Sequence, residues 1–255
     1  MSIITDPLFY LVALPAVIFL GLSKGGFSGI GMVSTPLLAL IMPPLEAAAI
    51  LLPIILIQDA ISVFVYRRVW DAWNLKVLIP GAVIGIGAAW LFAAYVPEAV
   101  VRLAVGLIAL GFVGYVAFRH LLPGEPPKPR AAHGVFWGAL SGFTTTLIQI
   151  GAPPYYAFVL PQRLPKMIYV GTTVMFFATA NVMKVVPYFA LGQFTTAGLA
   201  TSFALFPLAI ACNLLGIYLV RVTLEAMFYQ ITNVIVFALG CELTRQGLVE
   251  LLWRG

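Results

Sequence analysis

The chain is poor in charge and in the residues that build catalytic or metal sites. Only 9% of its 255 residues are charged, whereas 62% are hydrophobic; a soluble domain carries roughly 25% charged residues. The composition therefore indicates an integral membrane protein with no soluble domain. The net charge of +5 does not indicate a nucleic-acid partner, because lysine and arginine at the ends of membrane helices are topology signals.

Cysteine and histidine are almost absent. Cys212 and Cys241 stand singly in apolar segments, and His120 and His133 flank a polar loop. A metal site or a nucleophile with its base needs such residues in clusters, and the sequence contains none. We therefore expect no enzyme, no catalytic residue, no metal and no cofactor.

Apolar runs separated by short turns predict an all-α polytopic membrane protein. About 20 apolar residues cross a bilayer as a helix. The predicted segments are 8–28, 32–42 (short), 46–66, 76–95, 99–119, 134–149, 153–161 (short), 166–189, 196–220 and 224–244. The sustained polar stretch 120–133 is a proline-stiffened linker. It separates a first transmembrane repeat, 1–119, from a second, 134–255, each of four or five segments.

Basic residues predict the orientation in the inner (plasma) membrane. They gather in alternate connections, which the positive-inside rule places in the cytoplasm together with the linker. These residues are Arg67, Arg68, Lys76, Arg119, Lys128, Arg130, Arg163, Lys166 and Arg221. Five crossings in each half make the two repeats inverted, which is the arrangement we favour. Re-entrant short segments would make the repeats parallel instead.

Two apolar segments are broken by glycine and proline at matching places in the two halves. The first reads GLSKGGFSGIGMVSTP at 21–36, and the second reads GALSGFTTTLIQIGAPP at 138–154. A broken membrane helix is tolerated only where protein or a wet cavity satisfies the freed backbone groups. Paired breaks are the best sequence pointer to the binding site of a transporter. We predict one substrate site formed by both breaks.

The breaks carry groups that a small anion needs. Free N–H groups at half-helix N-termini bind anions, and glycine lets the backbone approach closely. The candidate substrate-binding residues here are Ser23, Lys24, Gly25, Gly26, Gly29, Gly31, Ser34, Thr35, Thr144, Thr145, Gln149, Gly151 and Ala152. The alternative is close helix packing. We assign packing to the small-residue repeats of unbroken helices, Gly81, Gly85, Gly87, Gly134, Gly138 and Gly142.

Polar residues inside the predicted spans are further functional candidates. Asp59 lies roughly 20 Å along its helix. It is the candidate coupling residue, which would take up a proton or pair with a lysine. The alternative is a structural hydrogen bond to a neighbouring helix. Lys24 attracts an anion or snorkels to the inner surface. One helix carries a polar stripe made of Thr173, Asn181 and Lys184. These residues join the candidate substrate-binding residues. For Lys184 the alternative is that its side chain snorkels to the membrane surface.

Motifs in a fixed order run along nearly the whole chain. They are GLSKGGF at 21–27, PLLAL at 36–40, GALSGF at 138–143, GAPP at 151–154, LPQRL at 160–164, GTTV at 171–174 and YFALGQ at 188–193. Together they resemble the TauE/SafE (TSUP) sulfite-exporter family. The resemblance implies a homo-oligomeric permease for small sulfur-containing or other organic anions. The family usually carries Gly-Gly where this chain has Gly151-Ala152.

These observations favour a secondary transporter of sulfite, sulfonates such as sulfoacetate, or carboxylates. The sequence has no Walker motif, so we expect coupling to H⁺, to Na⁺ or to the membrane potential. An anion leaving a negative-inside cell gains about 2.3 kcal/mol per charge per 100 mV, which favours export by alternating access. A non-transporting assembly subunit and a membrane enzyme are the alternatives.

Overall fold

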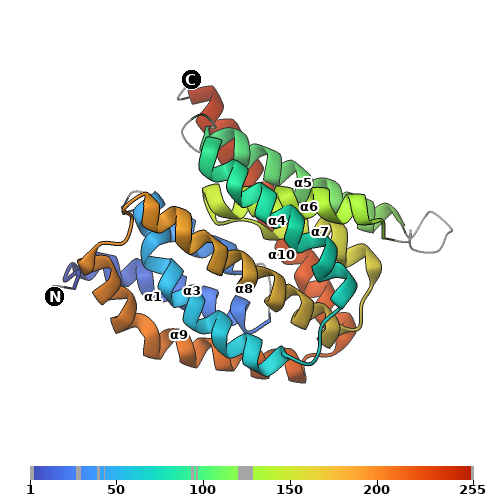
Figure 1. Ribbon diagram of the computed structural model, residues 1–255, viewed down its shortest axis with the longest axis horizontal. Helices are drawn as coiled ribbons and strands as arrows, with labels where there is room; N and C mark the ends of the chain where they lie inside the picture. Colours follow the sequence, from blue (N-terminus) through green and yellow to red (C-terminus); the bar gives the residue numbers. More distant parts are fainter. Residues whose placement is uncertain are drawn as a thin grey trace. The chain divides into compact units, whose positions relative to one another are not determined.

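The computed structural model describes residues 3–26, 30–38, 41–42, 44–92, 95, 97–119 and 129–253. These residues form helices and connecting turns, with no strand among them (Figure 1). The elements are α1 (Pro7–Lys24), η1 (Ile30–Val33), α2 (Ser34–Leu38), α3 (Pro44–Tyr66), α4 (Ala72–Phe92), α5 (Glu98–Arg119), α6 (Ala131–Ile148), α7 (Ala152–Val159), η2 (Leu160–Gln162), α8 (Lys166–Ala190), α9 (Thr196–Val222) and α10 (Glu225–Trp253). The predicted all-α class is confirmed.

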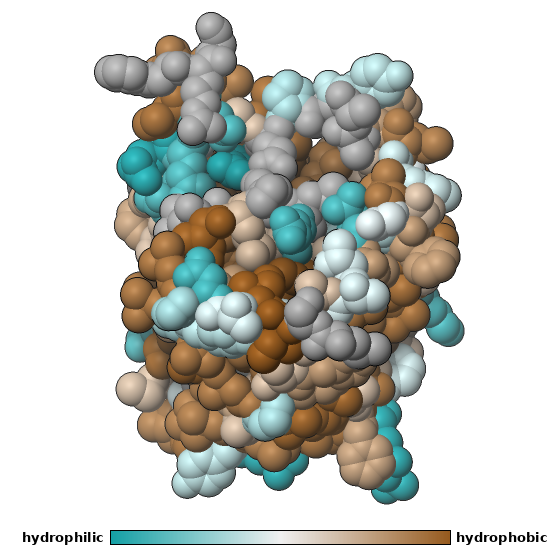
Figure 2. All heavy atoms as spheres, turned by 90° about the vertical axis from the view of Figure 1, so that its left-hand side faces the viewer, coloured by the Kyte–Doolittle hydropathy of each residue, from teal (hydrophilic) through white to brown (hydrophobic). Residues whose placement is uncertain are grey.

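Five of the described helices are long and apolar enough to cross a membrane: α1, α3, α4, α8 and α9. Their outer faces expose large apolar side chains, among them Leu11, Phe64 and Val186. Figure 2 shows apolar side chains over much of one face of the molecule. In water such exposure would be costly, whereas lipid tails solvate it, so the polytopic membrane prediction is confirmed.

Helix ends differ from the predicted segments at both ends of the chain. Helix α1 stops at Lys24, before the predicted end at 28, because Gly26 has a φ of +133°, which favours glycine and interrupts the helix. Helix α10 continues to Trp253, beyond the predicted end at 244. Charged residues end its apolar run but do not end the helix, because they pair with one another.

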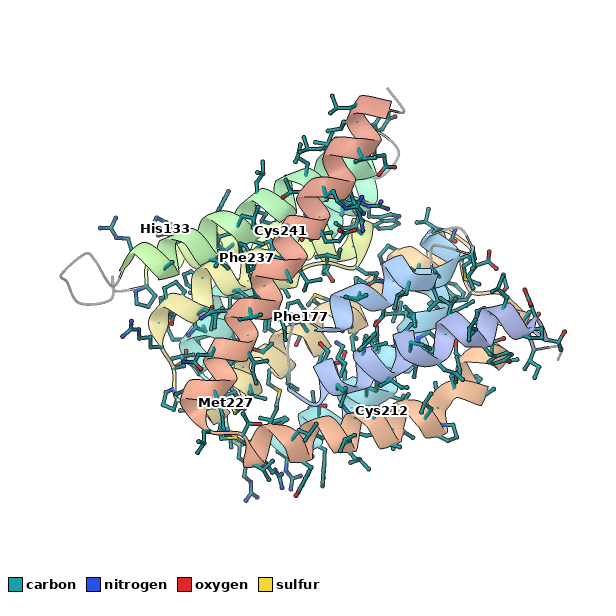
Figure 3. All side chains as sticks on the ribbon, turned by 180° about the vertical axis from the view of Figure 1, so that it is seen from behind. His133, Phe177, Cys212, Met227, Phe237 and Cys241 are labelled. Carbon is teal, nitrogen blue, oxygen red and sulfur yellow. The ribbon has the colours of Figure 1, made fainter. Side chains whose placement is uncertain are left out.

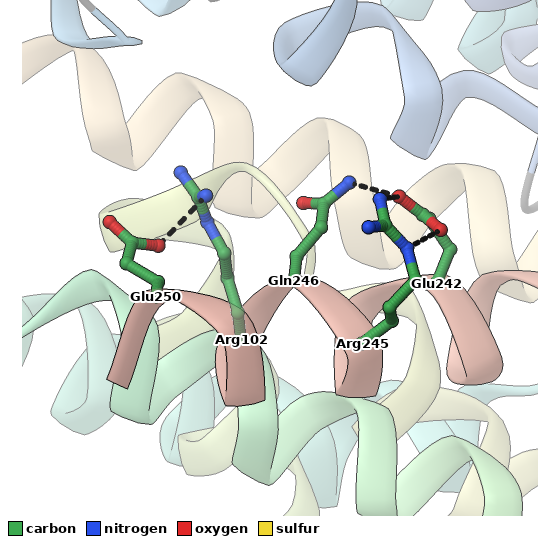
Figure 4. Close-up of polar contacts among 5 residues, drawn as sticks. All are labelled: Arg102, Glu242, Arg245, Gln246 and Glu250. Carbon is green, nitrogen blue, oxygen red and sulfur yellow. Dashed lines mark hydrogen bonds and ion pairs between the residues drawn. The ribbon is translucent and has the colours of Figure 1, made fainter. Parts of the chain in front are cut away.

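Those pairs lie along α5 and α10 (Figure 4). Arg245 donates to Glu242 from Nε at 2.9 Å and from Nη2 at 2.7 Å, and Gln246 donates to the same carboxylate at 2.7 Å. Arg102 of α5 forms an ion pair with Glu250 of α10 at 3.2 Å. Side chains three or four residues apart meet on a helix surface. These polar contacts therefore stabilise the last turns of α10, where an apolar run no longer indicates a helix.

The chain folds into two compact units. The first contains Met1–Trp70 and Val170–Leu224, and the second contains Asp71–Tyr169 and Glu225–Gly255. Each unit therefore takes helices from both halves of the sequence. The division of the sequence into repeats at 1–119 and 134–255 stays a prediction.

In the first unit, α1 packs along α9 (Figures 1 and 3). A Cβ atom on Gly21 would lie 2.5 Å from Cβ of Cys212, and one on Gly25 would lie 2.6 Å from the Asn213 carbonyl oxygen. The two backbones thus touch where small residues face each other, as membrane helices do. Contacts advance in the same sense along both helices, so α1 and α9 run parallel.

In the second unit, α4 packs along α6 in the same parallel sense. Glycines of both helices meet the partner backbone: Gly81 faces Val135, and a Cβ atom on Gly142 would lie 2.5 Å from the Ala82 carbonyl oxygen. The packing role predicted for these glycine repeats is confirmed at Gly81, Gly85, Gly134, Gly138 and Gly142. It is wrong for Gly87, which has open space beside it.

Helices α5 and α10 pack in opposite directions in the second unit. Gly106 of α5 lies against Thr244, while Leu103, earlier in α5, lies against Gly247 of α10.

The two cysteines are free thiols, with Cys212 buried on α9 and Cys241 exposed on α10 (Figure 3).

Candidate functional site

The first break begins where α1 ends, and what it presents is the carbonyl end of a helix. The N–H groups of Gly25 and Gly26 donate to the carbonyls of Gly21 (2.9 Å) and Ser23 (3.0 Å), so these two amides are used within the last turn of α1. The partial charge at a helix C-terminus is negative. Lys24, in that last turn, is placed where a cation is favoured.

Two side chains of α3 hold the end of α1. The Ser62 hydroxyl donates to the Lys24 carbonyl oxygen at 2.8 Å, and the Tyr66 hydroxyl donates to the Gly25 carbonyl oxygen at 2.9 Å. Carbonyls at a helix C-terminus have no partner within the helix. Side chains one turn apart on α3 satisfy these two, so the broken end is fixed by hydrogen bonds.

A buried carboxylate lies beside this end. Lys24 Nζ is 2.8 Å from Asp59 Oδ1, and Asn181 Nδ2 donates to Asp59 Oδ2 at 2.6 Å. Asp59 and Asn181 are 4% and 3% exposed. A charge taken out of water needs a counter-charge and hydrogen bonds on its remaining oxygens, and here α1 and α8 each supply one partner to a carboxylate of α3.

Lys184 brings a second amine to the carboxylate. It follows Asn181 by three residues on α8, is fully buried, and interacts electrostatically with both Lys24 and Asp59. Because its side chain is 0% exposed, it does not snorkel to a surface. With both lysines protonated, the cluster of Lys24, Asp59, Asn181 and Lys184 carries one excess positive charge. We call these four residues the carboxylate cluster.

The other candidates of the first unit lie around this cluster without joining it in the contacts described. Ser34 is buried and donates to the Ala16 carbonyl oxygen at 2.7 Å, which ties α2 to α1. Gly31 lies against Ser23, whose Oγ would be 2.9 Å from an added Cβ. Thr35 is also buried. Gly29 lies outside the described residues.

Thr173 shares α8 with the cluster but lies farther along it. It precedes Asn181 by eight residues, which corresponds to about 12 Å of helix, and its side chain is buried. The polar stripe predicted on α8 therefore has two parts that lie at different heights along the helix. Asn181 and Lys184 meet Asp59, while Thr173 belongs to an earlier turn.

The second break, between α6 and α7, is neutral and lies in the second unit. Gln149 ends α6 with a φ of +57°, and Gly151 precedes α7. The Ser141 hydroxyl donates to the Gly151 carbonyl oxygen at 2.6 Å. An added Cβ on Gly151 would lie 2.7 Å from Cβ of Thr145, so this glycine lets the break fold back against α6.

The start of α7 offers few backbone donors. Its first residue, Ala152, is followed by Pro153 and Pro154, which lack an N–H group. The Tyr155 N–H points back to the Gly151 carbonyl oxygen at 3.4 Å. Thr144 donates to carbonyls of its own helix. A role of the second break in substrate binding, alone or together with the first, stays a prediction.

Comparison with known proteins decides the family. The model of the sulfite exporter TauE/SafE family matches residues 13–243. The chain belongs to the sulfite exporter TauE/SafE family. It is therefore a multi-pass transporter of the inner membrane whose family handles a small anionic substrate. No curated protein and no solved structure matches the chain.

The match covers both breaks and the whole carboxylate cluster of this TauE/SafE protein. Among the described residues no group of three or more His, Cys, Asp or Glu gathers as in a metal site. Charge at the candidate site comes instead from one acidic and two basic side chains.

A row of polar residues on α3 carries more of the site than the sequence analysis assigned. Gln58, Ser62 and Tyr66 follow one another at four-residue spacing, so they share a face of α3, and each donates to a neighbouring helix. Asn213 of α9 donates to Ser62 Oγ at 3.0 Å. The four-residue spacing is the sequence signal that identifies this face.

A second unassigned contact gives a role to part of the LPQRL motif. Asn74 at the start of α4 and Gln162 in η2 exchange two amide hydrogen bonds, each of 2.9 Å. Asn74 also receives support from Asp71 Oδ1, to which its backbone and side-chain nitrogens donate. This pair fixes the end of α7 to α4 inside the second unit.

Proposed function

We propose that this protein is a secondary transporter that exports small organic or sulfur-containing anions, such as sulfite, sulfonates or sulfoacetate, by alternating access. The observation that carries the proposal is the buried Asp59 carboxylate held between Lys24 and Asn181, with Lys184 beside it. A carboxylate in such a place occupies the groups that a carboxylate, sulfonate or sulfite substrate would use.

In this mechanism the substrate and Asp59 compete for the same donors. Lys24 supplies an ammonium group, with its side chain 16% exposed, and Asn181 supplies a buried amide. Hydrogen bonds to charged groups contribute about 1.5–3 kcal/mol each. An arriving anion can replace Asp59 at modest cost because it restores the charge and the bonds that Asp59 gives up.

Protonation of Asp59 would couple this exchange to a proton. A neutral carboxyl group releases Lys24 and leaves the cluster with the positive charge that an anion needs. Export of an anion already gains about 2.3 kcal/mol per charge per 100 mV from a negative-inside potential. The proton therefore sets the affinity of the site, and the membrane potential is sufficient to drive the net flux.

The directions of packed helices support an inverted arrangement of the two halves. If α1 to α5 and α6 to α10 each cross the membrane five times, α3 and α9 must run parallel and α5 and α10 antiparallel. Hydrogen bonds pair Ile50 with Ser202 and Gln58 with Ala209, which is the parallel sense. Parallel repeats with four crossings each would reverse both relations.

The test is flux of labelled sulfite and sulfoacetate in proteoliposomes with an imposed potential. Lys24→Ala and Asn181→Ala each remove a charge-assisted bond, so we expect flux to fall about tenfold or more. Asp59→Asn should abolish the response of flux to a pH gradient. Thr179→Ala is the matched control on α8, because the Thr179 hydroxyl bonds within its own helix, and it should transport normally.

Undiminished flux in the Lys24→Ala and Asn181→Ala variants would refute the assignment of the site. Absence of flux for every sulfur and carboxylate anion in the wild type would refute the proposed substrate class. The amount of each variant in the membrane is compared with that of the Thr179→Ala protein. This comparison shows whether a variant loses flux because it fails to insert or because the site is changed.

A further inference from the structure

We propose that the interface of α3 with α9 holds a small monovalent cation, bound by the side-chain oxygens of Gln58 and Asn213 next to the carbonyl end of α1. Na⁺ is the cation we expect. The site is separate from the ion pair of Asp59 with Lys24, and it is composed of neutral oxygen ligands.

The two amides face each other across the interface. Gln58 Nε2 donates to the Ala209 carbonyl oxygen at 3.1 Å, and Asn213 Nδ2 donates to Ser62 Oγ at 3.0 Å. Gln58 and Ser62 are one turn apart on α3, as are Ala209 and Asn213 on α9. The two amide contacts therefore lie about one helical turn, roughly 5.4 Å, apart along the interface. Both side chains are fully buried.

Hydrogen bonding fixes which way each amide points. Ser62 gives its single hydroxyl hydrogen to the Lys24 carbonyl oxygen at 2.8 Å, so toward Asn213 it can only accept. The Asn213 nitrogen must therefore face Ser62. The Ala209 carbonyl is an acceptor only, so the Gln58 nitrogen must face it. Flipping either amide would set two acceptors against each other.

What remains is a pair of buried oxygens with nothing to bind. Gln58 Oε1 and Asn213 Oδ1 have no hydrogen-bond partner among the described residues. Buried polar side-chain atoms are nearly always satisfied, and each exception needs an explanation. These two amide oxygens belong to one interface, that of α3 with α9.

The surroundings favour a cation. Each amide nitrogen donates to an acceptor here, and the oxygen groups with remaining lone pairs are two amide oxygens, the Ser62 hydroxyl and the Lys24 carbonyl oxygen. The C-terminal end of α1 adds its partial negative charge. Small hard cations take oxygen ligands, and the carbonyl ends of broken membrane helices coordinate Na⁺ in transporters.

This placement gives the cation a defined effect. It would bind to the Lys24 carbonyl oxygen that Ser62 also contacts, and the side chain of the same residue holds Asp59. Binding therefore stabilises the broken end in the position that forms the carboxylate cluster. A coupling role for Na⁺ rests on the proposed transport function, whereas the binding itself does not.

The test is Na⁺ binding to the purified full-length protein in detergent. We expect the melting temperature to rise by a few degrees when NaCl replaces choline chloride at constant ionic strength. We also expect ²²Na⁺ binding to saturate at one ion for each protein molecule. Gln58→Met and Asn213→Leu each remove one oxygen ligand and should weaken Na⁺ binding at least about tenfold.

Ser202→Ala is the matched control. It removes a hydrogen bond across the same α3–α9 interface, from Ser202 Oγ to the Ile50 carbonyl oxygen at 2.7 Å, and leaves the two amide oxygens in place. It should lower the melting temperature in both salts and keep the Na⁺-dependent rise.

A wild-type protein with no response to Na⁺ and no ²²Na⁺ binding would overturn the proposal, since a buried water would then satisfy the two oxygens. An Na⁺ response that survives in both Gln58→Met and Asn213→Leu would overturn it as well. Binding in a protein that fails every flux assay would refute only the transport function. Flux without Na⁺ binding would refute only this site.

Discussion

The two units of this protein each contain one broken helix, but the breaks differ in chemistry. In the first unit the end of α1 lies near a carboxylate, two amines and three side-chain amides. In the second unit the Ser141 hydroxyl of α6 holds the carbonyl of Gly151, which precedes α7, and prolines occupy the start of α7. Similar glycine patterns thus accompany a charged break and a neutral one.

This difference shows that glycine marks where a membrane helix stops and does not determine what the freed end binds. Gly25 and Gly151 both allow close approach of backbone. Among the described residues, the first has ionisable side chains arriving from α3 and α8, and none is seen to reach the second. We therefore propose that ions are recognised in the first unit and expect substitutions there to have the larger effects.

The largest effect should come from breaking the buried ion pair. Asp59→Leu removes the carboxylate that pairs with the partly exposed Lys24 and interacts with the fully buried Lys184, and removing one partner of a buried pair costs about 3–5 kcal/mol. The double substitution Lys24→Met with Asp59→Leu should recover part of that stability, because it removes both charges of the ion pair but keeps Lys184. Unfolding in mixed micelles by SDS measures both values.

The same double variant also separates stability from function. It should remain unable to transport anions in proteoliposomes although it folds. An Asp59→Leu protein as stable as the wild type would contradict the role of the carboxylate as the counter-charge of Lys24.

An intermediate effect is expected at the glycine contacts. In Gly25→Ala the added methyl group would lie 2.5 Å from the backbone nitrogen of Ile217 and 2.6 Å from the Asn213 carbonyl oxygen. Overpacking of this kind costs about 1–3 kcal/mol, and it would separate α1 from α9. Thermal unfolding in detergent measures the loss.

Gly87→Ala in the second unit is the control for this substitution. Nothing lies within 4 Å of the added Cβ, and alanine is favoured over glycine inside a helix by up to about 1 kcal/mol. It should leave stability unchanged or raise it. Equal losses at both glycines would mean that packing space does not explain the first.

The smallest effect is expected for the ion pair of the second unit. Arg102 and Glu250 are 3.2 Å apart with side chains 24% and 28% exposed. Pairs that reach solvent contribute about 0.2–1 kcal/mol, so Arg102→Gln should change the unfolding free energy by no more than that. A loss as large as that of Asp59→Leu would remove the contrast between the two ion pairs.

Local patterns were sufficient for the fold class and for the location of the breaks. Hydrophobic runs predicted the helices, and the glycines of 21–36 predicted a break there, because both are properties of a few neighbouring residues; the end of α1 at Lys24 precedes the predicted end at 28. The pairing of Asp59 with a lysine was one of two alternatives that the sequence left open. Burial of Lys184 decided against snorkelling.

Long-range hydrogen bonds were beyond local patterns. Gln58 meets Ala209 and Asn74 meets Gln162 across large separations in sequence, and no short motif encodes such a meeting. The polarity of the first break was also missed. A glycine cluster does not reveal whether N–H or C=O groups face the site, and here the amides of Gly25 and Gly26 are used within α1.

The bonds from Ser62 and Tyr66 to the last carbonyls of α1 have a consequence for motion. In the alternating access that we propose, bending between α1 and α3 would break two buried hydrogen bonds at once, so we expect these two helices to move together. We then expect the movement to occur relative to α8, which binds Asp59 through the amide of Asn181.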